Sequence, residues 1–155
     1  MELTEQRTIA MPREAVYAAL NDPEILKQCI PGCKELNMHS PTELEAVMGL
    51  KIGPVKATFN SAVTLTNLNP PESYTLVGEG KGGPAGFAKG SADVRLIEDG
   101  ETTVLEYSVK ANVGGKLAQI GSRLVESTTR KIAANFFEKF TEIVEERSPQ
   151  PDAPA

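Results

Sequence analysis

The stretch Val55-Lys56-Ala57-Thr58-Phe59-Asn60-Ser61-Ala62-Val63-Thr64-Leu65 alternates between two kinds of side chain. Its odd-numbered positions are apolar or small, and its even-numbered positions are mostly polar. This period of two is typical of a β-strand that has one face against a core and the other in water. We therefore expect a strand over residues 54–67. Its inward side chains would be Val55, Ala57, Phe59, Ser61, Val63 and Leu65.

The same period recurs on both sides of this strand, between Pro- and Gly-containing turns. It predicts further strands near residues 3–10, 33–39, 42–51, 73–80, 87–98 and 102–111. Consecutive strands with short connections form an antiparallel meander. The inward positions of the later strands include Tyr74, Leu76, Gly78, Ala88, Gly90, Ala92, Leu105 and Tyr107.

Helical spacing appears at three places. Two short helices are expected after the first strand, at 13–20 and 24–28, and Asp22-Pro23 supplies the start of the second. A long helix is expected over 116–146, where apolar residues form one broad stripe. The sequence thus predicts an α+β protein, with a curved seven-stranded antiparallel sheet around a long C-terminal helix. Residues 1–147 would form a single domain and 148–155 a disordered Pro-rich tail.

Composition narrows the classes of function. The 155 residues include 16 Lys and Arg against 21 Asp and Glu, a formal net charge of −5, and no Trp. This balance argues against a nucleic-acid binder, and it argues against simple electrostatic adsorption to anionic lipid. The polar start of the chain does not resemble a signal peptide, and no apolar run is long enough to span a bilayer. We therefore expect a cytoplasmic location.

Small residues are frequent at central inward positions. Ala57, Ser61, Gly78 and Gly90 are examples on the strands, and the long helix carries Gly121. Two interpretations are open at this point. Small residues facing each other leave an unfilled apolar volume that suits a hydrophobic ligand. Alternatively, they permit sheet curvature and a close approach of the helix.

Several blocks of sequence resemble the family of the carbon monoxide dehydrogenase G subunit, within the START-like helix-grip (SRPBCC) superfamily. The similarity extends over about residues 1–145. The blocks are Ile30-Pro31-Gly32-Cys33, Gly53-Pro54-Val55-Lys56-Ala57-Thr58-Phe59, Pro70-Pro71-Glu72-Ser73-Tyr74, Gly80-Lys81-Gly82-Gly83, Gly86-Phe87-Ala88-Lys89-Gly90-Ser91-Ala92, Gly114-Gly115-Lys116-Leu117-Ala118-Gln119-Ile120-Gly121 and Phe136-Phe137.

The resemblance implies a helix-grip fold with a cavity under the long helix. It implies a non-enzymatic accessory protein that binds a lipid or isoprenoid quinone and assists a molybdenum hydroxylase of the carbon monoxide dehydrogenase type. A further expectation is recruitment of that enzyme to the inner membrane face by peripheral contact, without a covalently bound cofactor. Some members carry an apolar C-terminal anchor, whereas this chain has only a short Pro-rich tail after Arg147.

The cavity prediction names residues from the sheet and from the long helix, together with an entrance loop. The expected lining is Val55, Ala57, Phe59, Ser61, Val63, Tyr74, Leu76, Ala88, Gly90, Ala92, Leu105, Tyr107, Leu117, Ile120, Gly121, Leu124 and Thr128. The expected entrance loop is Gly82, Gly83, Gly86 and Phe87, for which a gate and a plain flexible hairpin loop are both open.

No catalytic or metal-binding residue is assigned. Cys29 and Cys33 are four apart, so they form no C-x-x-C motif, and His39 is the only histidine. The alternative function is an enzyme of the polyketide cyclase or hydrolase type, which would use Tyr107, Asp93 or His39 as acid or base.

Three further patterns have simple interpretations. Gly78-Glu79-Gly80-Lys81-Gly82-Gly83 matches the letters of a dinucleotide motif, but strands flank it where that motif needs a helix. Lys116, Arg123 and Arg130 recur every seven residues on a helix that also carries acidic residues, which indicates a mixed solvated face. Asp93 and Arg95 are expected on the surface.

Overall fold

The computed structural model describes residues 1–146. The expected tail at 148–155 lies outside the described residues. The chain begins with β1 (Glu2–Ile9), followed by α1 (Arg13–Leu20) and α2 (Pro23–Cys29). Six strands follow: β2 (Cys33–Ser40), β3 (Glu43–Ile52), β4 (Val55–Asn69), β5 (Ser73–Lys81), β6 (Phe87–Asp99) and β7 (Thr102–Gly114). A short 3-10 turn, η1 (Gly83–Ala85), joins β5 to β6, and α3 (Lys116–Gln119) and α4 (Ser122–Glu146) complete the described chain.

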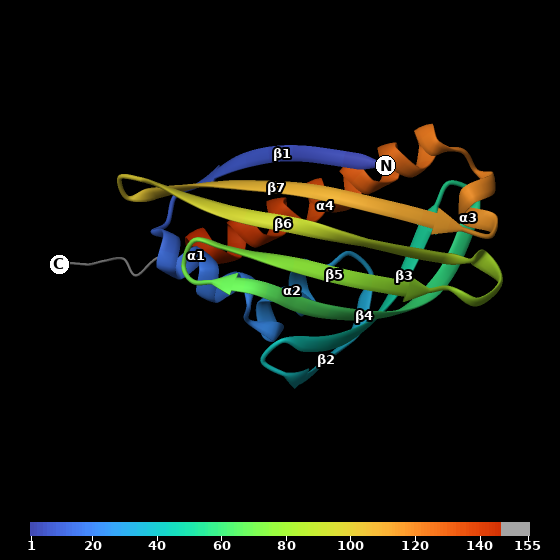
Figure 1. Cartoon of the computed structure of the whole chain (residues 1–155), viewed down its shortest axis with the longest axis horizontal. Helices are drawn as coiled ribbons and strands as arrows, with labels where there is room; N and C mark the ends of the chain where they lie inside the picture. The colour runs from blue at the N-terminus through green and yellow to red at the C-terminus, as the bar shows by residue number, and fades with distance from the viewer. Residues whose placement is uncertain (147–155) are drawn as a thin grey trace.

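All seven strands belong to one antiparallel sheet. Their order is β1-β7-β6-β5-β4-β3-β2, so β1 closes one edge against β7 and the remaining strands form an uninterrupted meander. The sheet curves around α4, which lies along its concave side (Figure 1). This is the helix-grip arrangement that the family resemblance implies, and each of the seven expected strands is present.

The two short helices lie between the first two strands. Asp22 caps α2, because its Oδ1 accepts a hydrogen bond of 2.9 Å from the Glu24 backbone N–H, and Pro23 occupies the first turn. Such a cap satisfies a donor that the helix leaves without a partner. The helix α2 then packs against both α4 and β2, which places the pair at one end of the sheet.

The expectation of one continuous helix over 116–146 is wrong. The chain forms a single turn, α3, and then breaks at Gly121, whose φ of 97° lies in the left-handed region. Helix α4 begins at Ser122. A glycine adopts this conformation without the steric cost that a side chain would impose. Because the chain changes direction here, the residues on either side of the break do not share one helical stripe.

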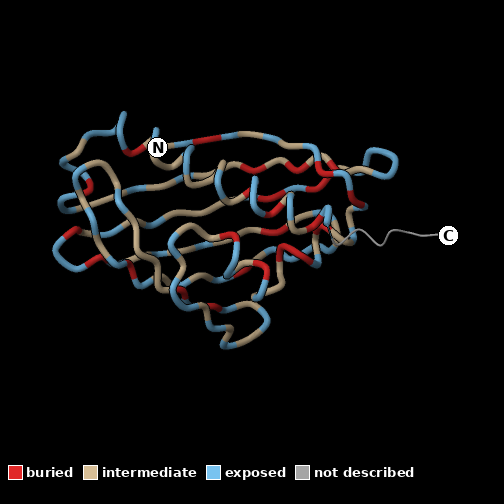
Figure 2. The backbone as a smooth tube through the Cα atoms, turned by 180° about the vertical axis from the view of Figure 1, so that it is seen from behind, coloured by how far each residue is buried: buried red, intermediate tan, exposed pale blue. Residues whose placement is uncertain are grey.

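The main core occupies the end of the molecule that carries α1 and α2. It joins these helices to the C-terminal half of α4 and to the neighbouring ends of the strands, and Phe140, Ile9, Leu96 and Leu105 are almost inaccessible to water. A second, smaller cluster lies at the opposite end around Phe59, Ala85 and Leu117. Figure 2 shows buried residues gathered at the first end and few in the middle of the strands. The two clusters therefore leave the middle of the concave face between them.

Candidate functional site

The strand register explains why the middle of the concave face is poorly filled. Two neighbouring rows across β4, β5, β6 and β7 are built almost entirely of small residues. One row is Val63, Gly78, Gly90 and Ala111, and the next is Ser61, Gly80, Ala88 and Val113. The row on the side of the main core is larger, with Leu65, Leu76, Ala92 and Val109. The side chains thus shrink where α4 passes over the centre of the sheet.

A cavity of about 300 Å³ lies over these small rows. Its floor is the part of the sheet just described, and its other walls come from β3, β4, α3 and α4. Those walls are Met48, Leu50, Ile52, Phe59, Leu117, Val125, Thr128, Thr129 and Ile132. A second hollow shares Val63, Gly78, Ala88 and Ala111 with the cavity and continues past Gly90 and Ala92. The space is therefore elongated along the sheet, and its surface is almost wholly apolar.

Three hydroxyl groups interrupt the apolar lining. Thr129 donates a hydrogen bond of 2.8 Å to the Val125 carbonyl one turn earlier on α4. Ser61 on the floor and Thr128 on the roof have no hydrogen-bond partner within residues 1–146. Each is free to bind an oxygen atom of a guest molecule. The cavity is thus an apolar space with two hydroxyl groups that have no hydrogen-bond partner within residues 1–146.

The predicted entrance loop closes the end of the cavity that lies away from the main core. A Cβ at Gly82 would lie 2.5 Å from the Phe59 ring, so the loop backbone is in direct contact with this wall residue. Gly86 packs just as tightly against the backbone of Gly114. Phe87 points the other way, because it occupies an outward position of β6 and its ring covers Gly114 on the convex face. Phe87 is therefore no cover for the cavity.

The structure brings together only part of the predicted lining. Phe59, Ser61, Val63, Ala88, Leu117 and Thr128 border the cavity. Leu76, Gly90 and Ala92 border the hollow beside it. Val55 and Ala57 pack in the small cluster at the closed end, whereas Tyr74, Leu105 and Tyr107 belong to the main core. Ile120, Gly121 and Leu124 flank the helix break and lie outside the lining, since no continuous helix turns them inward.

The predicted lining left out residues on four elements: Gly78, Glu79 and Gly80 on β5, Ala111 and Val113 on β7, and the two groups on β3 and α4 that follow. Met48, Leu50 and Ile52 lie on β3, where the even-numbered positions face inward. Val125, Thr129 and Ile132 lie on α4 at spacings of four and three residues, which place them on one helix face. The alternation on β3 and the helical spacing were both present in the sequence. What the sequence lacked was the position of the helix break, which decides the face of α4 that covers the sheet.

Tyr107 belongs to the main core and does not border the cavity. Its hydroxyl donates to Glu5 Oε1, and Arg130 Nη1 lies 3.2 Å from the other oxygen of the same carboxylate. Its ring stacks on Phe137 with 4.8 Å between centroids. Arg130 also contacts Glu126 at 3.3 Å. Arg130 is one of the three basic residues that recur every seven positions, and it is thus paired with acidic groups. Tyr107 thus joins β1, β7 and α4.

This network predicts a loss of stability at high pH. Burial and, after it, the bond to Glu5 raise the pKa of Tyr107 from 10.0 to about 12. A raised pKa in the folded state means that the folded chain keeps this proton where the unfolded chain releases it. The contribution to stability is then complete below about pH 10 and is lost as the pH rises toward 12. Urea unfolding across this range should show the loss, and the loss should be smaller in Tyr107→Phe. An equal dependence on pH in both proteins would contradict the assignment.

The other residues singled out from the sequence lie away from the cavity. His39 Nε2 is 2.8 Å from Glu45 Oε1 on the exposed edge of the sheet, and Asp93 accepts a hydrogen bond of 2.8 Å from Thr75 on the outer face. Cys29 is buried and Cys33 half-buried, both as free thiols. Within residues 1–146 no group of three or more His, Cys, Asp or Glu side chains is placed to hold a metal ion. The glycine motif at 78–83 runs from β5 into η1, between antiparallel strands.

Fold and cavity together define a START-like helix-grip protein, and comparison with solved structures agrees. A START superfamily protein from Mycobacterium smegmatis matches with a TM-score of 0.72 at 13% identity, over 94% of this chain and 97% of that one. The Zhui aromatase/cyclase from Streptomyces sp. R1128 matches with a TM-score of 0.69 at 14% identity, over 99% of each chain. Likeness at these identities shows the fold alone.

The family follows from a match to a family model. The model of the CoxG family, named for the G subunit of carbon monoxide dehydrogenase, matches residues 6–145, and the chain belongs to this family. A conserved protein from Geobacillus kaustophilus is similar in structure, with a TM-score of 0.89 and 31% identity over 94% of this chain and 96% of that one. No curated protein matches the chain. Among the described residues, no helix combines the length and apolarity needed to cross a bilayer.

Proposed function

We propose that this protein binds a hydrophobic small molecule, a lipid or an isoprenoid quinone, in the cavity beneath α4. We further propose that it does so as an accessory protein of a carbon monoxide dehydrogenase-type molybdenum hydroxylase, with no catalytic step of its own. The family membership supports the accessory role. The observation that carries the ligand proposal is the apolar cavity of about 300 Å³ over two rows of small residues.

The cavity favours a guest on energetic grounds. Side chains that line an empty space lose dispersion contacts, and mutational series put the penalty at about 24 cal/mol per Å³ of cavity. Gly78 and Gly90 lie directly opposite each other on β5 and β6, so neither residue has a side chain to fill the gap. A bound apolar molecule would supply the missing contacts. Binding of such a ligand would therefore stabilise the folded state of the protein.

The nature of the lining favours binding over catalysis. An enzyme of the cyclase or hydrolase type would need acid and base groups that converge on the substrate. Within residues 1–146, Glu79 is the one titratable residue that borders the cavity, and its exposed side chain lies on the outer face of β5, in the pair with Lys89. Tyr107 and His39 are engaged elsewhere. The lining instead offers two hydroxyl groups that suit a carbonyl or hydroxyl oxygen.

Removing one hydroxyl should weaken the binding of a ligand that carries oxygen and leave the binding of an oxygen-free ligand almost unchanged. We expect Ser61→Ala to weaken binding of dimethylnaphthoquinone about 3- to 10-fold, the effect of losing one hydrogen bond. Binding of dimethylnaphthalene should stay within about twofold of wild type, because it makes no such bond. Both can be measured by displacement of a fluorescent anilinonaphthalene sulfonate probe. Equal losses for the two ligands would show that Ser61 shapes the cavity without binding oxygen.

The physiological ligand and the accessory role call for separate experiments. Mass spectrometry of an organic extract of the protein, purified from its own cells, should show one lipophilic molecule per chain. Deletion of the gene should lower hydroxylase-dependent quinone reduction in membranes while dye-linked hydroxylase activity persists. If dye-linked activity fell equally, the protein would be needed for assembly or catalysis of the enzyme, and the ligand-carrying role would be wrong.

A further inference from the structure

Three lysine side chains gather on the outer, convex face of the sheet; we call them the lysine cluster. Lys51 and Lys56 lie directly opposite each other on β3 and β4. Lys34 comes from β2, and its amine lies 3.5 Å from the Thr58 hydroxyl on β4. A Cβ at Gly49, which is opposite Thr58, would be 3.0 Å from Lys34 Cε, so this lysine lies across a bare glycine. The three amines thus come from three strands and from two successive rows, about 7 Å apart along the strands.

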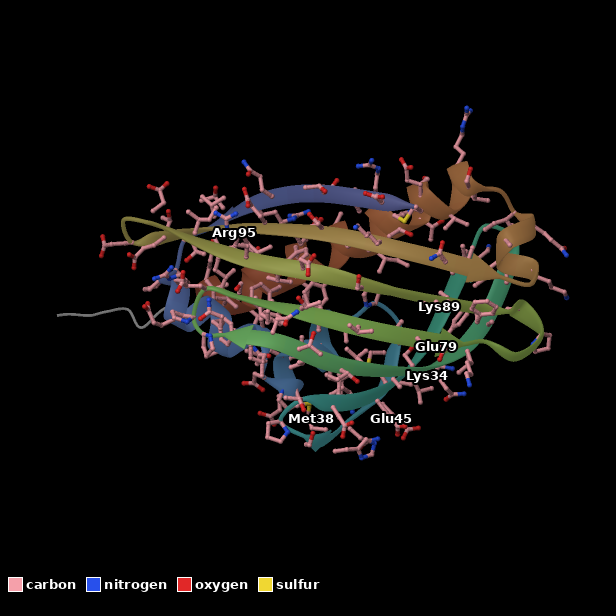
Figure 3. All side chains as sticks on the ribbon, viewed as in Figure 1. Lys34, Met38, Glu45, Glu79, Lys89 and Arg95 are labelled. Carbon is pink, nitrogen blue, oxygen red and sulfur yellow. The ribbon has the colours of Figure 1, made fainter. Side chains whose placement is uncertain are left out.

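No acidic side chain forms an ion pair with the lysine cluster within residues 1–146. The three ion pairs of this part of the chain are His39–Glu45, Arg130–Glu5 and Arg130–Glu126. Like charges directly opposite each other in a sheet are destabilising, and Lys51 and Lys56 form such a pair. Figure 3 shows Lys34 on the half of the molecule that carries α3, whereas Arg95 lies toward the other end. A bound anion would therefore remove a repulsion that the chain itself leaves in place.

A hollow of about 550 Å³ lies among the amines of the cluster. Its lining consists of the three lysines together with Gly49, Leu50, Ala57 and Thr58. A second hollow of similar volume adjoins it, because the two share Lys56, Ala57 and Thr58. The remaining walls of the second hollow are Pro54, Val55, Asn60, Gly82, Gly83, Pro84, Ala85 and Lys116. The pair of hollows thus combines four cations with one amide side chain and several apolar groups.

The edge of β4 adds backbone donors to the second hollow. On the side away from β3, β4 pairs with β5 only from Asn60 onward, so the earlier part of the strand has no neighbouring strand there. Successive N–H groups of a strand point to opposite sides. The odd-numbered ones of β4 face β3, as the bond of 2.8 Å from the Leu65 N–H to the Thr42 carbonyl shows. The N–H groups of Lys56 and Thr58 therefore face the second hollow, where they are available to an anion.

We propose that the lysine cluster and the two hollows form a binding site for a soluble molecule with linked phosphates, such as a nucleoside di- or triphosphate. Lysine is a common phosphate binder, and hydrogen bonds between charged groups are stronger than neutral ones. A chain of phosphates extends over both rows of amines, whereas a single phosphate meets one of them. The nucleoside lies in the second hollow, against Val55 and Pro84, with the Asn60 amide available to a base edge. The inference goes beyond the proposed function and does not rest on it.

Isothermal titration calorimetry of the full chain, at matched ionic strength and without divalent cations, tests this site. We expect one molecule of inorganic triphosphate to bind per chain, and ATP to bind at least as tightly. Glycerol phosphate, which has a single phosphate, should bind at least ~10-fold more weakly than triphosphate. Absence of triphosphate binding, or equal affinities for glycerol phosphate and triphosphate, would overturn the proposal. Adenosine should not bind measurably, and an affinity equal to that of ATP would overturn it as well.

Removing the positive charges of the cluster locates the site. The triple variant Lys34→Gln, Lys51→Gln, Lys56→Gln should bind triphosphate at least ~10-fold more weakly than wild type, because each substitution removes a charged hydrogen-bond donor. Its free energy of unfolding without anion should equal or exceed that of wild type, since the like-charge pair is gone. Triphosphate should raise the unfolding free energy of wild type more than sodium chloride of the same ionic strength does, and this gain should be absent in the variant.

A second triple variant controls for net charge. Lys27→Gln, Lys131→Gln, Lys139→Gln removes the same charge from exposed positions on α2 and α4. Because charges far apart on a surface are screened by salt, this control should bind triphosphate within about twofold of wild type. Equal losses in the two triple variants would show a response to net charge alone, and the assignment of the site to β2, β3 and β4 would be wrong.

Discussion

Gly78→Leu is expected to abolish binding of apolar ligands while the protein remains folded. Gly78 lies in the middle of the cavity floor, and a Cβ there meets its nearest atoms, Val63 Cγ2 and the Ala62 carbonyl oxygen, at 3.4 and 3.5 Å, which is ordinary contact. A leucine side chain would therefore extend into the cavity without displacing backbone. We expect affinity for the anilinonaphthalene sulfonate probe to fall at least ~100-fold, because the substituted side chain takes the place of the guest. The free energy of unfolding should stay equal or rise, since glycine is unfavourable within a strand.

Val77→Leu is the matched control for this experiment. Val77 precedes Gly78 on the same strand, faces outward and is 46% exposed. Its substitution should leave both ligand binding and unfolding unchanged. Gly90 is unsuitable for the same purpose although it lies opposite Gly78, because a Cβ there would overlap the Lys110 carbonyl oxygen. Unchanged binding in a folded Gly78→Leu protein would show that ligands bind elsewhere.

Phe140→Ala is expected to cost about 3–5 kcal/mol of unfolding free energy. Phe140 is fully buried in the C-terminal half of α4, where its ring lies near Phe136 and Phe137 in the main core. Removing the ring leaves a void that the surrounding helices and strands cannot fill. Urea unfolding followed by circular dichroism measures the change. A loss of unfolding free energy below about 1 kcal/mol would contradict the view that the C-terminal half of α4 holds the helix to the main core while its N-terminal half covers the cavity.

Leu124→Ala provides the comparison at the other end of α4. Leu124 is 37% exposed and contacts the β3–β4 turn at Gly53. We expect a loss of less than about 1 kcal/mol in unfolding free energy, as for other exposed positions. Together the two variants test whether α4 is held to the sheet at its C-terminal half and only covers the cavity at its start.

The strands were predictable because their alternation is local. On β4 the odd-numbered residues face the core side along most of the strand, as the sequence pattern indicates, and Asp22-Pro23 marks the start of α2 correctly. The helix break was not predictable in this way. Gly121 in a helical pattern is compatible with a continuous helix, and only the packing of α3 against η1 and β7 shows that the chain turns there.

The candidate site was predictable only in part, for a related reason. Small residues on single strands were visible in the sequence, but their alignment into two adjacent rows depends on the register between β4, β5, β6 and β7. Inward direction alone could not separate Tyr107, which fills the core, from Ala88, which leaves space.

Diffraction from crystals under xenon pressure tests the central claim most directly. The crystals should be grown from protein refolded from denaturant, so that no guest from the cell remains. Xenon binds apolar cavities, and we expect it between the floor at Gly78 and the roof at Val125. Side chains that fill this space, with α4 resting directly on the sheet and no xenon beneath it, would contradict the account.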